Sequence, residues 1–218
     1  MFGRFRLYNV RNWNLYFVSG CILVLGWTCQ TSSDKADFEA EEDNFDWSPI
    51  SPPVRDSALA LIEGGQLTGR YVGIGGWPSQ QYDRASWIRS NASRSELDSL
   101  KQHHNSAVRA TAYEALLLRD SSTEVRYNLL LGALNDTLTF ISYQQGCTGD
   151  VLMLGEYLIL QTAPNLVGGP PSRLPEVSEG FTETQIATIR ELYEYHLAKK
   201  RAYYDLRFPI DENGDLID

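Results

Sequence analysis

Two consecutive helical patterns within residues 104–134 constrain the fold more than any other feature of the chain. Val108, Ala112, Ala115 and Leu116 recur at the spacing of one helix face, and Asp120-Ser121-Ser122 ends that pattern. A second helical pattern follows, with Val125-Arg126 in the place of Val108-Arg109; its apolar positions are Val125, Leu129, Leu130, Ala133 and Leu134. We therefore expect two helices in tandem that pack through their apolar faces.

Most of the remaining chain predicts further helices. Apolar periodicity and capping residues place them at 55–63, 79–89, 93–102, 151–160 with Asp150 as its cap, and 182–204. Two stretches favour extended structure or turns instead, the glycine-rich 69–78 and the β-branched 137–143, and a loop is expected at 144–149. The expected fold class is mainly α, a small α-α superhelix or helical globule with one or two short extended or β segments.

The N-terminus looks like a targeting segment. Arg4, Arg6 and Arg11 precede an apolar run at 15–27, and no acidic residue occurs before Thr28. An apolar run of this length suits the core of a signal peptide and is short for a membrane span, which needs about 20 residues. The alternatives are an uncleaved signal anchor and a plain secretory signal, and all of them place the folded part outside the cytoplasm.

The polar stretch CQTSSD follows the apolar run directly. This order is similar to a bacterial lipoprotein signal peptide, in which the cysteine is lipidated and becomes the first residue of the mature chain. The resemblance implies lipidation at Cys29. Cys21 is the alternative because small residues, Val18-Ser19-Gly20, precede it. The expected location is the cell envelope, as a periplasmic or surface-exposed lipoprotein.

Acidic residues dominate the charge of the chain and cluster near its start. The net charge is −9, and residues 32–47 carry seven acidic side chains (Asp34, Asp37, Glu39, Glu41, Glu42, Asp43 and Asp46) against one lysine. Nucleic-acid binding needs clustered Lys and Arg, so a nucleic-acid partner is excluded. Like charges repel and favour an extended chain, which predicts a flexible tether at 29–53 between a signal segment at 1–28 and a helical domain at 54–208. Residues 209–218 are expected to form an acidic tail.

The stretch NSAVRATAYEAL at 105–116 resembles the second helix of a HEAT repeat. In that family a turn with Asn or Asp leads into Val-Arg and then into Ala and Leu on the buried face. The resemblance covers about 81–160. It implies that Arg109 and Arg126 are structural arginines that bond turn groups of neighbouring repeats. Together with the N-terminus, the chain resembles a bacterial envelope lipoprotein with a small HEAT-like domain, and this resemblance implies no reaction.

Residues that could carry chemistry are few. Cys147 and His196 are weak candidates, because no nucleophile signature surrounds the cysteine and the histidine falls on an apolar helix face. His103 and His104 are adjacent and cannot chelate a metal as an i, i+4 pair. The glycines at 73–76 lack the lysine of a phosphate loop, and Asp211–Asp215 lacks the remaining ligands of a calcium loop. We expect no metal and no cofactor.

These observations favour a non-catalytic, membrane-anchored envelope protein that uses its helical domain for protein–protein interaction or scaffolding. Two alternatives stay open. One is an envelope hydrolase with an unrecognised site. The glycine-rich stretch at 73–76 and Cys147 are the residues that support this alternative. The other is a purely structural envelope component.

Overall fold

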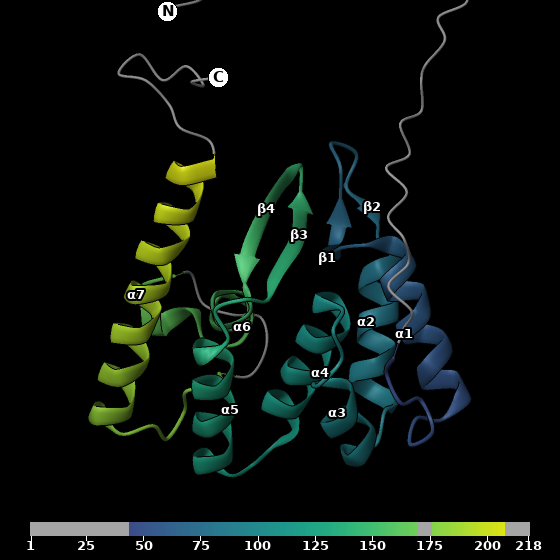
Figure 1. Cartoon of the computed structure of the whole chain (residues 1–218), viewed down its shortest axis with the longest axis horizontal. Coiled ribbons are helices and arrows are strands. Elements are labelled where there is room, and N and C mark those ends of the chain that lie inside the picture. The colour runs from purple at the N-terminus through teal and green to yellow at the C-terminus, as the bar shows by residue number, and fades with distance from the viewer. Residues whose placement is uncertain (1–43, 170–175, 208–218) are drawn as a thin grey trace, which may run out of the picture. The chain divides into compact units, whose positions relative to one another are not determined.

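The computed structural model describes residues 44–169 and 176–207, with side chains described up to Lys200. The helices are α1 (Pro52–Gly64), α2 (Gln80–Asn91), α3 (Arg94–Leu100), α4 (Ser106–Arg119), α5 (Thr123–Asn135), α6 (Leu154–Thr162), the 3-10 helix η1 (Pro164–Val167) and α7 (Glu183–Arg207). The strands are β1 (Leu67–Val72), β2 (Trp77–Pro78), β3 (Phe140–Gly146) and β4 (Thr148–Met153). The expected fold class, mainly α with a few short strands, is confirmed (Figure 1).

Helix α4 lies at the centre of the described domain. Asn105 caps it by accepting hydrogen bonds from the amides of Ala107 and Val108, at 3.0 and 3.3 Å. Its alanines and leucines are buried on several sides, and helices α1, α2, α3, α5 and α6 all pack against it. A helix that is apolar on most of its circumference is stable only when neighbours surround it, and this one supplies the core of the fold.

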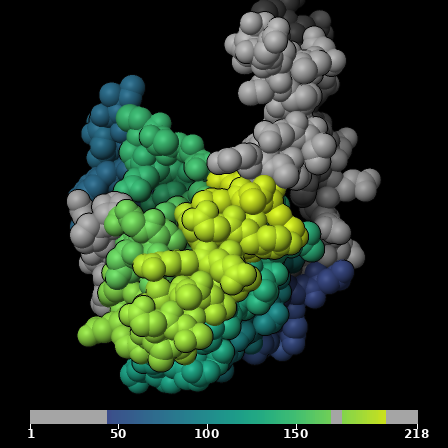
Figure 2. All heavy atoms as spheres, turned by 90° about the vertical axis from the view of Figure 1, so that its left-hand side faces the viewer, coloured from purple at the N-terminus to yellow at the C-terminus, as the bar shows by residue number. Residues whose placement is uncertain are grey.

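The strands form one sheet in the order β2-β1-β3-β4. Strands β1 and β2 form one antiparallel hairpin, β3 and β4 form a second, and β1 runs parallel to β3 with Val72 opposite Gly146. The turns of both hairpins therefore lie at the same end of the sheet. Figure 2 shows the hairpins as adjacent projections, β1–β2 in blue and β3–β4 in green.

Two expectations around residue 150 are wrong. Residues 144–149 continue the β3–β4 hairpin instead of forming a loop, and Asp150 does not cap a helix, because the strand continues to Met153 and α6 begins at Leu154. Met153 pairs with Phe140 in the ladder, and its amide donates to the Glu156 carboxylate at 3.2 Å. An apolar run bounded by no turn residue does not reveal where a strand passes into a helix.

The folded part also begins earlier than expected. The rings of Phe45 and Trp47 lie 4.5 and 5.2 Å from that of His103, Ile50 is buried, and Pro52 opens α1. The tether predicted for 29–53 is therefore wrong over 44–53, because Phe45 and Trp47 at the end of the acidic run, and Ile50 after it, pack on the core. The predicted segments 1–28, 29–43 and 209–218 lie outside the described residues.

Helices α5 and α6 cross closely at Gly155. A Cβ atom at this position would lie 2.8 Å from the Cα atom of Leu134 and 3.1 Å from the carbonyl oxygen of Ala133. Only a glycine allows the two backbones this approach.

Within the described ranges, no helix combines the length and the apolar character needed to cross a bilayer.

Candidate functional site: a groove between α3 and α5

A groove of about 320 Å³ lies between α3 and α5. Helix α4 contributes Tyr113 to its lining, and α3 and its C-terminal cap contribute one wall while α5 contributes the other. The residues that line it are Arg94, Lys101, Tyr113, Val125, Asn128, Leu129 and Gly132. Three successive helices thus build the site, and the α4–α5 pair that dominates the sequence pattern supplies most of its residues.

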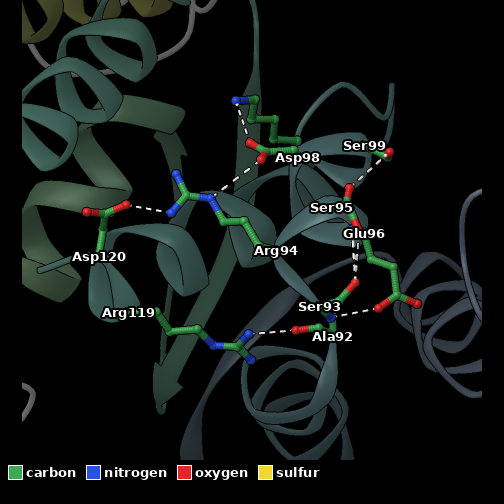
Figure 3. Close-up of polar contacts among 10 residues, drawn as sticks. Ala92, Ser93, Arg94, Ser95, Glu96, Asp98, Ser99, Arg119 and Asp120 are labelled. Carbon is green, nitrogen blue, oxygen red and sulfur yellow. Dashed lines mark hydrogen bonds and ion pairs between the residues drawn. The ribbon is translucent and has the colours of Figure 1, made fainter. Parts of the chain in front are cut away.

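The α3 wall carries charges that compensate one another. Arg94 reaches between two carboxylates, with Nε 3.4 Å from Asp98 and Nη1 2.5 Å from Asp120 (Figure 3). The Lys101 ammonium group lies 2.9 Å from Asp98 as well. The hydrogen bond from Arg94 lowers the pKa of Asp120, and the bond to Asp120 raises the pKa of Arg94. Two cations facing two anions leave the wall polar but without net charge.

The junction between α2 and α3 holds that wall in place. Ser93 and Glu96 form a capping box, in which the Ser93 amide donates to the Glu96 carboxylate at 2.6 Å. From α4, the Arg119 guanidinium donates to the carbonyl oxygens of Ala92, at 2.6 Å, and of Arg89. The bonds of Arg119 hold the end of α2, from which α3 starts, against α4 (Figure 3). Helix α3 itself is anchored by the buried Leu97 and Leu100.

The α5 wall is open and apolar except for Asn128. Val125 and Leu129 are only half-buried, although the sequence pattern places them on the packed face of the helix. Gly132 is exposed, and a Cβ atom there would make an ordinary contact, 3.7 Å, with the Tyr113 hydroxyl. Gly132 is therefore not at a close approach of two helices. It keeps the groove open beside Tyr113.

The arginine expected to be structural in α4 bonds groups from two separate turns. The Arg109 Nε atom donates to the His103 carbonyl oxygen at 3.0 Å, ahead of α4. Its Nη1 atom donates to Asp136 Oδ2 and Thr139 Oγ1, both at 2.8 Å, beyond the end of α5. This one side chain ties the start of α4 to the end of α5.

The second such arginine makes fewer contacts. The Nη2 atom of Arg126 donates to the carbonyl oxygen of Glu179 at 2.8 Å and contacts Thr123 Oγ1 at 3.4 Å. It joins the start of α5 to the segment ahead of α7. Neither arginine lines the groove.

Sequence reasoning missed a buried polar cluster formed by Arg89, Glu114 and Tyr157. Glu114 Oε2 lies 3.2 Å from Arg89 Nη1 and accepts a hydrogen bond from the Tyr157 hydroxyl at 3.1 Å. Burial raises the pKa of Glu114, and burial together with the nearby Glu114 raises the pKa of Tyr157. The only feature of the sequence that could have indicated this cluster is Glu114, a charged residue among the apolar positions of α4. The cluster joins α2, α4 and α6 inside the core.

Cys147 and His196 occupy different surroundings. Cys147 is exposed in the turn between β3 and β4. His196 is buried in α7. Burial lowers the pKa of its imidazole, and this outweighs the opposite effect of the Leu134 backbone. Neither residue lines the groove. Within 44–169 and 176–200, no group of three or more His, Cys, Asp and Glu side chains is arranged to hold a metal ion.

Comparison of the chain with protein-family models, with curated proteins and with solved structures finds no match.

Proposed function

We propose that the chain is a membrane-anchored envelope protein whose helical domain binds a segment of another protein in the α3–α5 groove. The observation that carries this proposal is the groove itself, an open site with an apolar α5 wall and a charge-compensated α3 wall. Arrays of packed helices present concave faces of this kind to protein partners. The proposed HEAT-like character of α4 and α5 is supported by the bonds of Arg109 to turns at both ends of the pair.

The groove favours an apolar segment over a strongly charged one. Val125, Leu129 and the ring of Tyr113 offer apolar surface, and burying such surface stabilises a complex by about 25 cal/mol per Å². Its volume of about 320 Å³ lies near the lower end of small-ligand pockets, about 300–1,000 Å³. We infer a partner segment that inserts a few apolar side chains, and the Asn128 amide, whose nitrogen donates to Glu124 at 3.1 Å, could accept one hydrogen bond from its backbone through the oxygen.

Membrane attachment through Cys29, or through Cys21, belongs to the same proposal. Radioactive palmitate supplied to growing cells should label the wild-type chain, and Cys29→Ala should abolish the label. A label that persists in Cys29→Ala and is lost in Cys21→Ala would assign the anchor to Cys21. An unlabelled wild-type chain would remove the lipid anchor from the proposal.

Filling the groove tests the binding function. Gly132→Phe should place a ring beside Tyr113 and exclude a partner, whereas Gly132→Ala adds one methyl group and should leave binding intact. A photo-crosslinking amino acid at Asn128 reports the partner in intact envelopes. We expect a discrete adduct in the Gly132→Ala background that disappears in Gly132→Phe.

A crosslinker at Ala187, which is exposed on α7 and does not line the groove, is the matched control. An adduct at Asn128 that survives Gly132→Phe, or that Ala187 reproduces, contradicts binding in the groove. The absence of any adduct favours a purely structural envelope component.

A further inference from the structure

The end of the sheet that carries both hairpin turns is free of charge. No Asp, Glu, Lys or Arg occurs at 71–82 or at 137–149, in a chain with 22% charged residues. Because β1 and β3 are parallel and Val72 lies opposite Gly146, the hairpin turns within these two stretches lie side by side. The nearest charges along the hairpins are Arg70 and Asp150, which lie next to the uncharged stretches.

Large apolar side chains project from this end. Ile74 is 98% exposed in the β1–β2 turn, and Trp77 and Tyr71 are 70% and 49% exposed beside it. These three residues, with the neighbouring turn at Cys147, define what we call the sheet tip. Single exposed apolar residues are ordinary, but three of them together at a projecting turn whose own residues carry no charge are not.

The sheet tip is a defined structure held by hydrogen bonds. The Gly73 amide donates to the Gly146 carbonyl oxygen at 2.8 Å, which joins the two turns, and the Gly76 amide donates to the Gly73 carbonyl oxygen at 3.1 Å. Gly73 and Gly76 have φ values of 72° and 62°, which glycine adopts readily. The indole ring of Trp77 lies over Gly75, where a Cβ atom would come within 2.6 Å of the ring nitrogen. The exposed side chains are therefore presented outward by the backbone.

We propose that the sheet tip inserts into the lipid surface of the membrane to which the chain is attached. The inference rests on the membrane anchoring proposed above. A convex tip whose turns carry no charge can bury its apolar side chains below the headgroups without desolvating an ion, whereas a charged side chain at that depth would have to lose its hydration. Trp and Tyr are the residues enriched at membrane–water interfaces, where the ring is apolar and its N–H or O–H remains hydrated.

The same features argue against a protein as the partner of the sheet tip. Protein interfaces usually anchor projecting aromatic residues in a pocket and enrich arginine around them. Here Arg70 is stacked on Tyr71, with its guanidinium carbon 5.6 Å from the ring centroid. Asp150 lies 3.6 Å from the Lys200 ammonium group. Both nearest charges already have partners within the chain, so the tip offers a second protein no unpaired charge.

Depth-dependent fluorescence quenching tests the proposal on the full chain in phosphatidylcholine vesicles. An environment-sensitive fluorophore is attached at Ile74→Cys in a chain in which Cys147, and whichever of Cys21 and Cys29 does not carry the anchor, are replaced by Ser. Nitroxide-labelled lipid serves as the quencher. Leu138→Cys is the matched control, because Leu138 is 88% exposed but precedes the opposite end of β3. We expect lipid quenching at position 74 to exceed that at position 138 several-fold. The difference should persist at high salt, because an uncharged contact is not screened.

A second variant removes the apolar contact without touching the core. Ile74→Asp with Trp77→Ser, in a chain labelled at the native Cys147 of the neighbouring turn, should lower lipid quenching of that label to the level of position 138. Equal quenching at positions 74 and 138 in vesicle-bound protein would overturn the sheet-tip inference and leave the anchor intact. A full chain that does not float with the vesicles would overturn the anchor, and the inference with it.

Discussion

At the scale of single residues, Glu96 joins more of the fold than its place on a short helix suggests. The Ser51 amide and hydroxyl donate to its Oε1 atom at 2.8 and 2.5 Å, while Oε2 accepts from the Ser93 amide. Burial opposes ionisation of this carboxyl, but the hydrogen bonds from Ser51 and Ser93 outweigh it and lower its pKa from 4.5 to about 2. One side chain thus caps α3 and holds the start of α1.

This geometry predicts a pH-dependent contribution to stability. A carboxyl whose pKa is lower in the folded state stabilises the fold above its unfolded pKa of 4.5, and that contribution is lost as the pH falls towards about 2. Glu96→Gln should lower the free energy of unfolding at pH 7 by about 1.5–3 kcal/mol and flatten its change across this window. Urea titrations at several pH values measure both effects. Glu63→Gln, at an exposed position on α1, should change the stability by less than about 0.5 kcal/mol.

The two arginines of the tandem pattern should differ in their importance. Arg109→Lys removes a planar fork that donates to three groups, and we expect a loss of about 2–3 kcal/mol. Arg126→Lys loses chiefly one bond, to a backbone carbonyl, and should cost about 1 kcal/mol. Chemical denaturation of both variants provides the comparison. Equal losses of unfolding free energy in the two variants would contradict the larger contribution of Arg109 to stability.

At the scale of elements, two glycines that each lie inside a helix differ in whether the fold requires them. Gly132 lies in α5 with room for a methyl group, while Gly155 in α6 faces the Leu134 backbone. Gly132→Ala should stabilise the protein by about 0.5–1 kcal/mol, because alanine favours the helix. Gly155→Ala should destabilise it by about 1–3 kcal/mol, because the two helices must separate. Thermal unfolding monitored by circular dichroism checks the signs. Destabilisation by both variants would show that Gly132 is packed.

The sheet shows why elements could be predicted only in part. The β-branched stretch at 137–143 indicated a strand, and β3 covers most of it. Its partner β4 was hidden, because Val151 and Leu152 read as the start of a buried helix when no neighbouring strand is known. Strand pairing joins residues that are distant in the sequence or depend on a partner strand, so the local periodicity of apolar residues does not predict it.

At the scale of the whole molecule, the boundary of the folded part is open to a direct test. A chain that begins at Asn44 retains Phe45, Trp47, Ile50 and the Ser51 donors, and should unfold at the same temperature as the full chain. A chain that begins at Val54, the boundary expected from the acidic run, should lose about 3 kcal/mol or more of apolar burial. For a domain of this size that corresponds to a decrease in Tm of roughly 6–12 °C.

Calorimetry of the two truncated chains distinguishes these outcomes. If both unfold at the same temperature, residues 44–53 contribute nothing to the core, and the original tether boundary is restored. A lower Tm for the shorter chain alone supports the earlier boundary.

The sequence by itself determined the helical class and the tandem pair α4 and α5, because helix periodicity and capping are properties of neighbouring residues. It also marked Arg109 and Arg126, and it indicated extended structure in the two stretches that contribute to the sheet tip. Only the tertiary structure decided that Val125, Leu129 and Gly132 line a groove, that Glu114 lies buried against Arg89 and Tyr157, and that the two hairpin turns meet. These features depend on contacts between residues far apart in the chain, which a periodic pattern of apolar residues does not specify.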